Sequence, residues 1–375
     1  MDHGKKLSLG KGGGIVLGTA TARQETAPPE RDTEAAMTSV VVPDNVVGAT
    51  ARPHVVIPDD IANRYGGNPD ELARLRAVAE VTIHGDRPTP AALAERIRDA
   101  DIVLSFRPAF TRFPQDVLAT AQRLRFICIA GAGVEDVDVA YASSRGIAVG
   151  NVTGSRRAMA EHCLALLFAV ARRIAEQDRA IRRGVWQPLQ GIELGGRTLG
   201  IVGLSATARE FAPLARALGM DVLSWSRDNS AERAAAVGST AVSLADVLGR
   251  ADVVSLHLRL FPELSGFLGR ERLAQMKRGA ILLNTARGEL VDEVALVEAL
   301  QTRRLSGAGL DVFTQVPLPA GHPLLTLDNV VMTPSSAWNT VDSAQRNLRR
   351  SIDNVLAFLR GEPVNIANIA ALGRQ

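Results

Sequence analysis

Short apolar runs alternate with polar, helix-like stretches from Pro53 onward. The first runs are HVVIP, VTIH, DIVLS, RFICIA and IAVG. They are rich in β-branched residues and apolar at successive positions, as strands are when helices cover both faces of a parallel sheet. After a long helical pattern, the alternation restarts with TLGIVG, DVLSWS, ADVVSLHL, GAILLNTA, LSGAGLDV and NVVMTP. The pattern predicts an α/β protein with two parallel sheets, and therefore two domains.

A long helical pattern separates the two groups of strands. It runs from Ser155, which suits an N-cap, to Gly184, which suits a helix stop. We predict one continuous helix between these residues. A second pattern, from Gln345 to Arg360, places alternating charges beside a helical apolar stripe. This is typical of a helix with one solvated face rather than of a nucleic-acid-binding surface.

Residues 1–51 lack any such pattern. The segment GKGGGIVLGTATARQETAPPERDTEAAMTS is rich in Gly, Thr, Ala, Pro and charged residues without a sustained period. We therefore predict a flexible extension over residues 1–51. Met37 is an alternative start of the protein, in which case residues 1–36 would not belong to it. The stretch GKKLSLGKGGG resembles a phosphate-binding loop, but Gly12 follows Lys11 where Ser or Thr is needed.

The composition narrows the class of protein further. Of the 375 residues 46% are apolar and 22% are charged, and the net charge of +3 is too small to indicate a nucleic-acid partner. No apolar run reaches the roughly 18–20 residues that a membrane span needs, and no signal peptide is expected. The two cysteines, Cys128 and Cys163, lie in apolar runs. We expect buried free thiols, a reducing cytoplasm and no metal site.

The stretch GGRTLGIVGLSATAREFAPLARALGMDVLSWSRDN reads as strand, turn, helix and strand. A dinucleotide-binding fold carries its Gly-x-Gly-x-x-Gly turn at this point, where the pyrophosphate meets a helix N-terminus. The three positions are Gly203, Ser205 and Ala208. Ala is an accepted variant at the third position, whereas Ser205 places a side chain where the phosphates come closest. The predicted cofactor-binding residues of this turn are Gly203, Leu204, Ser205, Ala206 and Thr207.

The carboxylate that would bind the ribose of NAD is missing. It is expected about 20 residues after the turn, at the end of the second strand. Ser226 and Arg227 stand there instead. An arginine at this place favours the 2′-phosphate of NADP over NAD. These residues alone leave an alternative interpretation, a Rossmann-type unit that binds no nucleotide.

The region from about Pro53 to Leu372 resembles the D-isomer-specific 2-hydroxyacid dehydrogenases, which include D-3-phosphoglycerate dehydrogenases and glyoxylate/hydroxypyruvate reductases. The resemblance rests on an ordered series of motifs: GAGVEDVDVAYASSRGIAVGNVTG, AEHCLALLFAVARRI, ELGGRTLGIVGL, MKRGAILLNTARGELVDEVALVEAL, GAGLDVF and HPLLTLDNVVMTP. It implies two Rossmann-like domains, one flavodoxin-like and one dinucleotide-binding. The substrate-side domain would comprise residues 52–151 and 335–375, and the NAD(P)-binding domain residues 152–334. It also implies a homodimer formed through the long helix.

The chemistry of this family needs an Arg, a His and a Glu. The Arg holds the substrate carboxylate, the His exchanges the hydroxyl proton, and the Glu orients the His. The resemblance assigns the Arg to Arg287 in the motif NTARG. The motif DVFTQVP has Val316 in the Glu position, and TPSSAWNT has Ser335 in the His position. Arg287 is therefore the one catalytic residue of the family that we expect to be retained.

Further residues follow from the same resemblance. The turn AGAGV is expected to receive the substrate carboxylate through Ala132, Gly133 and Val134, together with Arg287. A structural role for Arg287 stays open, and Asp311 either borders the cofactor or caps a strand. In LHLRLF, Arg259 and Phe261 replace a Pro and a Thr that we expect to border the nicotinamide. Additional cofactor-binding candidates are Ser226, Arg227, His257, Thr285, Ala286 and Asp311.

No histidine is predicted to replace the missing proton donor. His3, His54, His84, His162, His257 and His322 are each better explained as structural, although His257 is the nearest by topology. Three functions remain open. The chain is a working NAD(P)-dependent reductase of a 2-keto acid, a repurposed enzyme of another reaction class, or a non-catalytic binding protein. The C-terminal binding protein corepressors illustrate the third possibility. We favour a diverged oxidoreductase with unconventional or absent hydride transfer, which binds a small carboxylate.

Overall fold

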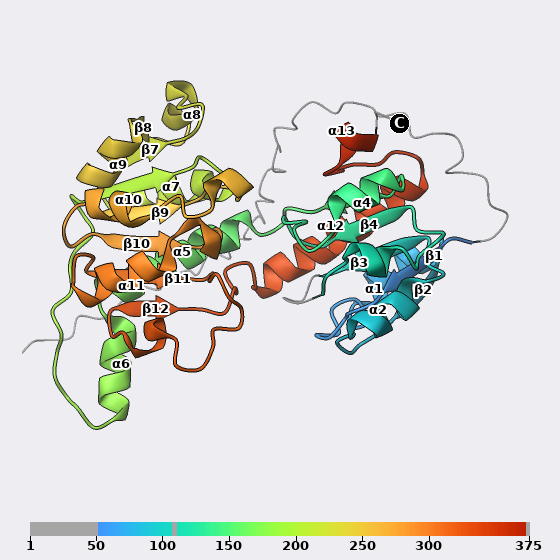
Figure 1. Cartoon of the computed structure of the whole chain (residues 1–375), viewed down its shortest axis with the longest axis horizontal. Coiled ribbons are helices and arrows are strands. Elements are labelled where there is room, and N and C mark those ends of the chain that lie inside the picture. Colours follow the sequence, from blue (N-terminus) through green and yellow to red (C-terminus); the bar gives the residue numbers. More distant parts are fainter. Residues whose placement is uncertain (1–51, 107–110, 373–375) are drawn as a thin grey trace, which may run out of the picture. The chain divides into compact units, whose positions relative to one another are not determined.

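The computed structural model describes residues 52–106 and 111–372, and the predicted extension over residues 1–51 lies outside this part of the chain. The described residues form two parallel sheets with helices between their strands (Figure 1). The predicted α/β class with two parallel sheets is therefore confirmed.

The first sheet has five parallel strands in the order β2-β1-β3-β4-β5. Its helices include α12, which comes from the end of the chain and packs on β3 and β4 (Figure 1). The strands are β1 (His54–Ile57), β2 (Glu80–Ile83), β3 (Ile102–Ser105), β4 (Phe126–Ile129) and β5 (Ala148–Asn151). The helices are α1 (Pro69–Arg76), α2 (Pro90–Ile97), α3 (Gln115–Leu118), α4 (Val139–Ser144), α12 (Val341–Leu359) and α13 (Ile369–Leu372).

The second sheet has seven strands in the order β12-β11-β10-β9-β6-β7-β8. The strands are β6 (Thr198–Val202), β7 (Asp221–Trp225), β8 (Thr240–Ala241), β9 (Val253–Leu256), β10 (Ile281–Asn284), β11 (Gly307–Leu310) and β12 (Val330–Met332). Its helices are α7 (Ala206–Ala217), α8 (Ala231–Ala235), α9 (Leu244–Arg250), α10 (Arg270–Gln275) and α11 (Glu293–Gln301), with short 3-10 turns at Pro262–Leu264, Gly288–Leu290 and Pro323–Thr326. Each predicted strand is present, and β8 is an additional short one. The proposed limits of the two domains remain a prediction.

The prediction of one continuous helix from Ser155 to Gly184 is wrong. The segment forms α5 (Arg156–Ala171) and α6 (Ile174–Arg182), with Arg173 between them in the left-handed conformation (φ 53°). The backbone N–H of Ile192 donates to the carbonyl of Ala171 at 2.8 Å. This carbonyl would otherwise accept the next intrahelical bond, so a loop that follows α6 ends α5. Gly184, at φ +78°, does stop α6 as predicted.

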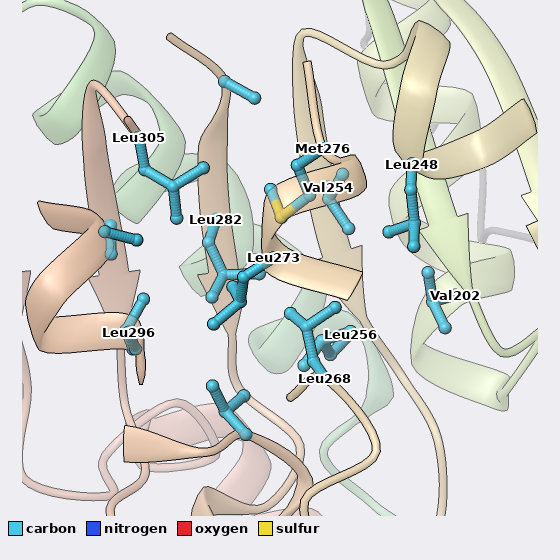
Figure 2. Close-up of a cluster of buried hydrophobic side chains, with 14 of the residues drawn as sticks. Val202, Leu248, Val254, Leu256, Leu268, Leu273, Met276, Leu282, Leu296 and Leu305 are labelled. Carbon is cyan, nitrogen blue, oxygen red and sulfur yellow. The ribbon is translucent and has the colours of Figure 1, made fainter. Parts of the chain in front are cut away.

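The strands are apolar because both faces of each sheet are covered. All four residues of β3, β4, β9 and β10 are buried. The buried cluster in Figure 2 lies on one face of the second sheet, where Leu256 and Leu282 meet Leu273 and Leu296 of the covering helices. A separate cluster on the other face joins α5 and α7 to the strands. Because all strands are parallel, the loops after them gather at the carboxyl edge of each sheet, where ligands bind in such folds.

Cys128 and Cys163 are free and buried, as predicted, and burial raises the pKa of their thiols to about 12 and about 11. Neither thiol is therefore a reactive thiolate at neutral pH. Within residues 52–106 and 111–372, no helix has the length and apolar character of a membrane span. The same residues contain no group of His, Cys, Asp or Glu side chains arranged to hold a metal.

Candidate functional site

The turn after β6 fits a dinucleotide. Gly203 has φ +97°, and a Cβ there would lie 2.9 Å from the backbone of His257 and Leu258, so only glycine is accommodated. The chain then enters α7, whose N-terminus suits a pyrophosphate. Ser205 is the N-cap of this helix, and its hydroxyl accepts the N–H of Ala208 at 3.3 Å. Ser205 therefore has a helix-capping role in addition to its place in the predicted phosphate-binding turn.

The site after β7 contains more charge than the sequence suggested. The Ser226 hydroxyl donates to Asp228 at 2.7 Å, and Asp228 also pairs with Arg233. The hydrogen bond from Ser226 lowers the pKa of Asp228 most, and the contact with Arg233 lowers it further. Arg233 in turn donates to the carbonyl of Leu204 in the phosphate-binding turn at 3.2 Å. Asp228 thus lies two residues beyond the expected ribose carboxylate and is already paired with an arginine.

Arg259 and Phe261 lie beside Arg227, and their expected place at the nicotinamide remains a prediction. The guanidinium of Arg227 lies 4.8 Å from the centre of the Phe261 ring, and that of Arg259 lies 5.7 Å from it. The loop after β9 thus contacts the loop after β7, although β6 lies between these strands in the sheet. Two guanidinium groups share one aromatic ring beside the position where a ribose-binding residue is expected.

His257 is a buried structural residue. It is 5% exposed, and its Nε2 lies 2.9 Å from the Ser255 hydroxyl. Burial lowers the pKa of His257 to about 4, so the ring is neutral at physiological pH. His257 therefore cannot serve as the missing proton donor.

Arg287 and the predicted carboxylate-binding turn are brought together. Arg287 follows β10 in an extended conformation, and its Nη2 lies 2.7 Å from the carboxylate of Glu135, directly after Val134. Within residues 52–106 and 111–372, the backbone N–H groups of Ala132, Gly133 and Val134 donate to no protein acceptor. Three N–H groups and a guanidinium are the donors that a carboxylate requires. Glu135 was missed by the sequence reasoning, although it follows the turn directly.

The neighbouring residues Thr285 and Ala286 are held by the protein. Thr285 shares a hydrogen bond of 3.1 Å with the buried thiol of Cys163. The N–H of Ala286 donates to Asn284, whose side-chain amide donates to the carbonyl of Arg287 at 2.9 Å. These bonds fix the backbone from which Arg287 extends, so its guanidinium is positioned by the end of β10.

Asp311 holds the loop that carries Ser335. Its carboxylate accepts the Thr333 hydroxyl at 2.6 Å and the backbone N–H groups of Ser336 and Ala337 at 2.8 and 3.0 Å. Its carbonyl accepts the N–H of Ser335 at 2.9 Å. These contacts favour the capping role over contact with the cofactor. Ser335 itself has φ +54°, a left-handed conformation.

The residues around Ser335 provide no replacement histidine. His162 binds the hydroxyl of Thr333 at 2.9 Å through Nε2 and lies 3.5 Å from Asp311, so it supports the same loop. His322 binds Glu293 at 3.0 Å. Val316, in the family position of Glu, is half exposed and precedes a cis proline. The residues in the predicted positions of the proton-transfer pair thus carry a hydroxyl and an aliphatic side chain.

The two parallel sheets and the glycine turn after β6 are typical of NAD(P)-dependent oxidoreductases with a Rossmann-type nucleotide domain. Residues 164–337 match the family model of the D-isomer specific 2-hydroxyacid dehydrogenase, NAD binding domain. The chain is 35% identical to the glyoxylate reductase of Korarchaeum cryptofilum over 84% of this chain and 96% of that protein. The chain therefore belongs to the D-isomer-specific 2-hydroxyacid dehydrogenase family.

Solved structures agree with this assignment. A protein from Thermus thermophilus superposes with a TM-score of 0.74 at 38% identity, covering 84% of this chain and 99% of that one. An acyclic imino acid reductase, in complex with NADPH and D-Arg, superposes with a TM-score of 0.73 at 27% identity, again over 84% of this chain and 99% of that one.

Proposed function

We propose that this protein binds a small 2-keto or 2-hydroxy carboxylate beside a nicotinamide nucleotide, with hydride transfer that proceeds without a side-chain proton donor or does not occur. The observation that carries the proposal is the Arg287 guanidinium paired with Glu135, the residue directly after the turn Ala132 to Val134. The residues expected to bind the anion are present, whereas Val316 and Ser335 stand in the expected positions of the proton-transfer pair.

The chemistry of the site follows from its donors. The nucleotide supplies a hydride when bound, and the glycine turn, α7 and Arg227 are the residues that would hold it. Arg287 holds the substrate carboxylate and withdraws electron density from the keto oxygen. A missing general acid lowers the rate by about 10²–10⁴-fold, so keto acid reduction is expected to be slow. A non-catalytic binding protein would use the same anion site.

Reduction of an imine is a second candidate, and the lost acid favours it. A keto oxygen needs a proton during reduction, whereas an iminium nitrogen already carries one. Arg287 and the N–H turn would still bind the carboxylate. The related structure of an acyclic imino acid reductase, at 27% identity, supports this reading.

An assay of NADPH consumption tests these functions. Glyoxylate alone is expected to be reduced slowly, and glyoxylate with excess methylamine, which forms an imine, about tenfold faster or more. The control reaction contains methylamine and NADPH without the acid. Equal rates with and without the amine, at the level of an ordinary dehydrogenase, would contradict both the proposed slow keto acid reduction and the proposed imine reduction. No consumption in either reaction, together with acid binding in a titration, would favour the non-catalytic alternative.

The cofactor is proposed to be NADP rather than NAD. A charge-assisted hydrogen bond contributes about 1.5–3 kcal/mol, a factor of about 10–100, so Arg227 and Arg259 together are expected to favour NADPH by at least that factor. Calorimetric titration with both nucleotides measures this preference. The Arg227→Ala variant should bind NADPH about tenfold more weakly and leave NADH binding unchanged, and exposed Arg250→Ala should resemble the native protein. Tight NADH binding without preference would refute the proposal.

A homodimer formed through α6 is proposed on its exposed apolar side chains. Ile174 and Ile181 of α6 are exposed, and Trp186 in the segment that follows is 86% exposed. This segment loops away from the strands before it returns to β6 (Figure 1). Such side chains on a soluble surface indicate an interface. A monomer in analytical ultracentrifugation would argue against this proposal.

A further inference from the structure

A cavity of about 150 Å³ lies at the carboxyl ends of β1 and β3. β1 and β3 are neighbours in the sheet. The connection after β1 leads outward to β2, and the connection after β3 leads in the opposite direction to β4. Ligands bind at such switch points in open α/β sheets. A cavity of roughly this volume admits a molecule the size of benzene. The lining residues are Asp59, Asp60, Ile61, Ala62, Arg64, Phe106 and Trp338.

Asp59 is buried without a full set of partners. It is 1% exposed, and its Oδ2 accepts the Ser105 hydroxyl at 2.7 Å. Its Oδ1 has no hydrogen-bond partner among the described residues, although the Thr111 hydroxyl is near enough to lower its pKa slightly. Burial dominates and raises the pKa of Asp59 to about 6. At neutral pH the protein thus keeps a buried, incompletely satisfied carboxylate, which is costly unless a donor completes it.

Several polar groups that line the cavity are held by other parts of the protein. Asp60 accepts the backbone N–H groups of Arg64, Tyr65 and Gly66, which shapes the loop. Arg64 donates to Asn339 at 3.0 Å. The Trp338 indole donates to the carbonyl of Ser335 at 3.0 Å. The Thr111 hydroxyl is one free donor near Asp59, and a cationic ligand in the cavity would supply a second.

The aromatic walls already hold one planar cation of the protein, which shows that they suit such a group. The Phe106 and Trp338 rings lie 6.2 Å apart, and the guanidinium of Arg64 lies 4.9 and 5.2 Å from their centres. The lining contains two carboxylates and one guanidinium, so its formal charge is −2 + 1 = −1. A second cation would meet a net negative charge and aromatic faces, both of which attract it.

The position of the cavity fixes the length of the ligand. β1, β3 and β4 are neighbours, and strands lie about 4.8 Å apart, so Asp59 lies roughly 10 Å from the carboxylate-binding turn after β4. An acid with a side chain as long as that of lysine or arginine spans this distance. The Trp338 wall also belongs to the loop that carries Ser335, which places the cavity beside the proposed reaction site.

We propose that the Asp59 cavity binds the ammonium or guanidinium end of a 2-keto or 2-imino acid whose carboxylate lies at Arg287. The assignment of the carboxylate end rests on the proposed function. The cavity itself does not, since Asp59, Phe106 and Trp338 would bind such a cation without it.

Binding of a cation that has no carboxylate tests the cavity alone. Butylguanidinium is titrated calorimetrically into the full chain, with butanol as the uncharged comparison. The native protein is expected to bind butylguanidinium, and Asp59→Asn to bind it at least tenfold more weakly. The control Asp116→Asn removes an exposed carboxylate from α3 and should leave binding unchanged. Absence of binding, or equal binding by Asp59→Asn, would overturn the proposal.

The Asp59→Asn protein should fold, because the change removes a buried charge and keeps the polar contact with Ser105. Phe106→Leu provides an independent variant. It keeps an apolar side chain but removes one aromatic face, and is expected to weaken butylguanidinium binding severalfold. Unchanged affinity in Phe106→Leu and in Asp59→Asn would exclude the cavity as the binding site.

A pair of acids separates this proposal from the proposed function. The keto acid of arginine is expected to bind about tenfold more tightly than that of norleucine, and Asp59→Asn should abolish the difference. Equal affinity of the two acids overturns the cavity proposal and leaves the carboxylate site intact. Binding of butylguanidinium without binding of either acid supports the cavity and contradicts the proposed function.

Discussion

The double variant Ser335→His/Val316→Glu is expected to reduce glyoxylate or hydroxypyruvate about 10²–10⁴-fold faster than the native protein. The histidine would supply the missing acid, and the glutamate would orient its ring and raise its basicity. Residue 335 has φ +54°, a conformation in which histidine is better tolerated than most residues. Val316 is half exposed, so a carboxylate there stays hydrated until it meets the ring. NADPH absorbance gives the rate.

The two substitutions are expected to act as a unit. Ser335→His alone should help little, because an imidazole without its carboxylate is poorly oriented. The gain of the double variant should exceed the product of the single gains. Ser336→His with Val316→Glu is the matched control, in which the histidine is displaced by one position. A native protein that already turns over such acids at ordinary dehydrogenase rates would show that Ser335 does not mark a lost function.

Arg287→Ala is expected to weaken binding of 2-keto and 2-hydroxy acids by about 10–100-fold, since a hydrogen-bonded charge contributes about 1.5–3 kcal/mol. Lysine would replace the charge but not the planar pair of donors, so Arg287→Lys should recover only part of the affinity. Thermal-shift titration with a series of acids measures the loss. Identical shifts in native and Arg287→Ala protein would show that the anion is held elsewhere.

Glu135→Gln is the matched control for this arginine. The Glu135 carboxylate lies 2.7 Å from the Arg287 guanidinium, so a bound ligand carboxylate must compete with Glu135. Removing the competing charge is expected to leave acid binding as strong as in the native protein or to strengthen it severalfold. A loss of acid affinity in Glu135→Gln as large as in Arg287→Ala would indicate that the Glu135–Arg287 ion pair stabilises the loop after β4 and does not form the ligand site.

The strands could be predicted because each is buried on both faces, which leaves a nearly continuous apolar run in the sequence. The break between α5 and α6 could not, because no glycine or proline marks it and the competing N–H comes from Ile192. The position of Phe261 beside Arg227 also depends on the order of strands in the sheet, which the sequence does not state directly.

Parts of the candidate site were predictable for a different reason. Gly203 stands in a motif that only a tight turn requires, and its φ of +97° agrees. Asp59, by contrast, reads as an ordinary turn residue in the run PDD after a strand. It bonds Ser105 of β3 and lines a cavity with Trp338, more than 270 residues further along the chain, so no local pattern identifies it.

Asp311 fixes the shape of the loop over residues 333–337 without a contact to the side chain of residue 335. The bonds that fix the loop use the Asp311 side chain or carbonyl, the Thr333 hydroxyl, backbone groups and the Trp338 indole, and none uses the side chain of residue 335. Exchange of that side chain for another that tolerates the left-handed conformation therefore carries little folding cost. Such a position lets a protein lose, regain or replace one chemical step while its architecture stays constant.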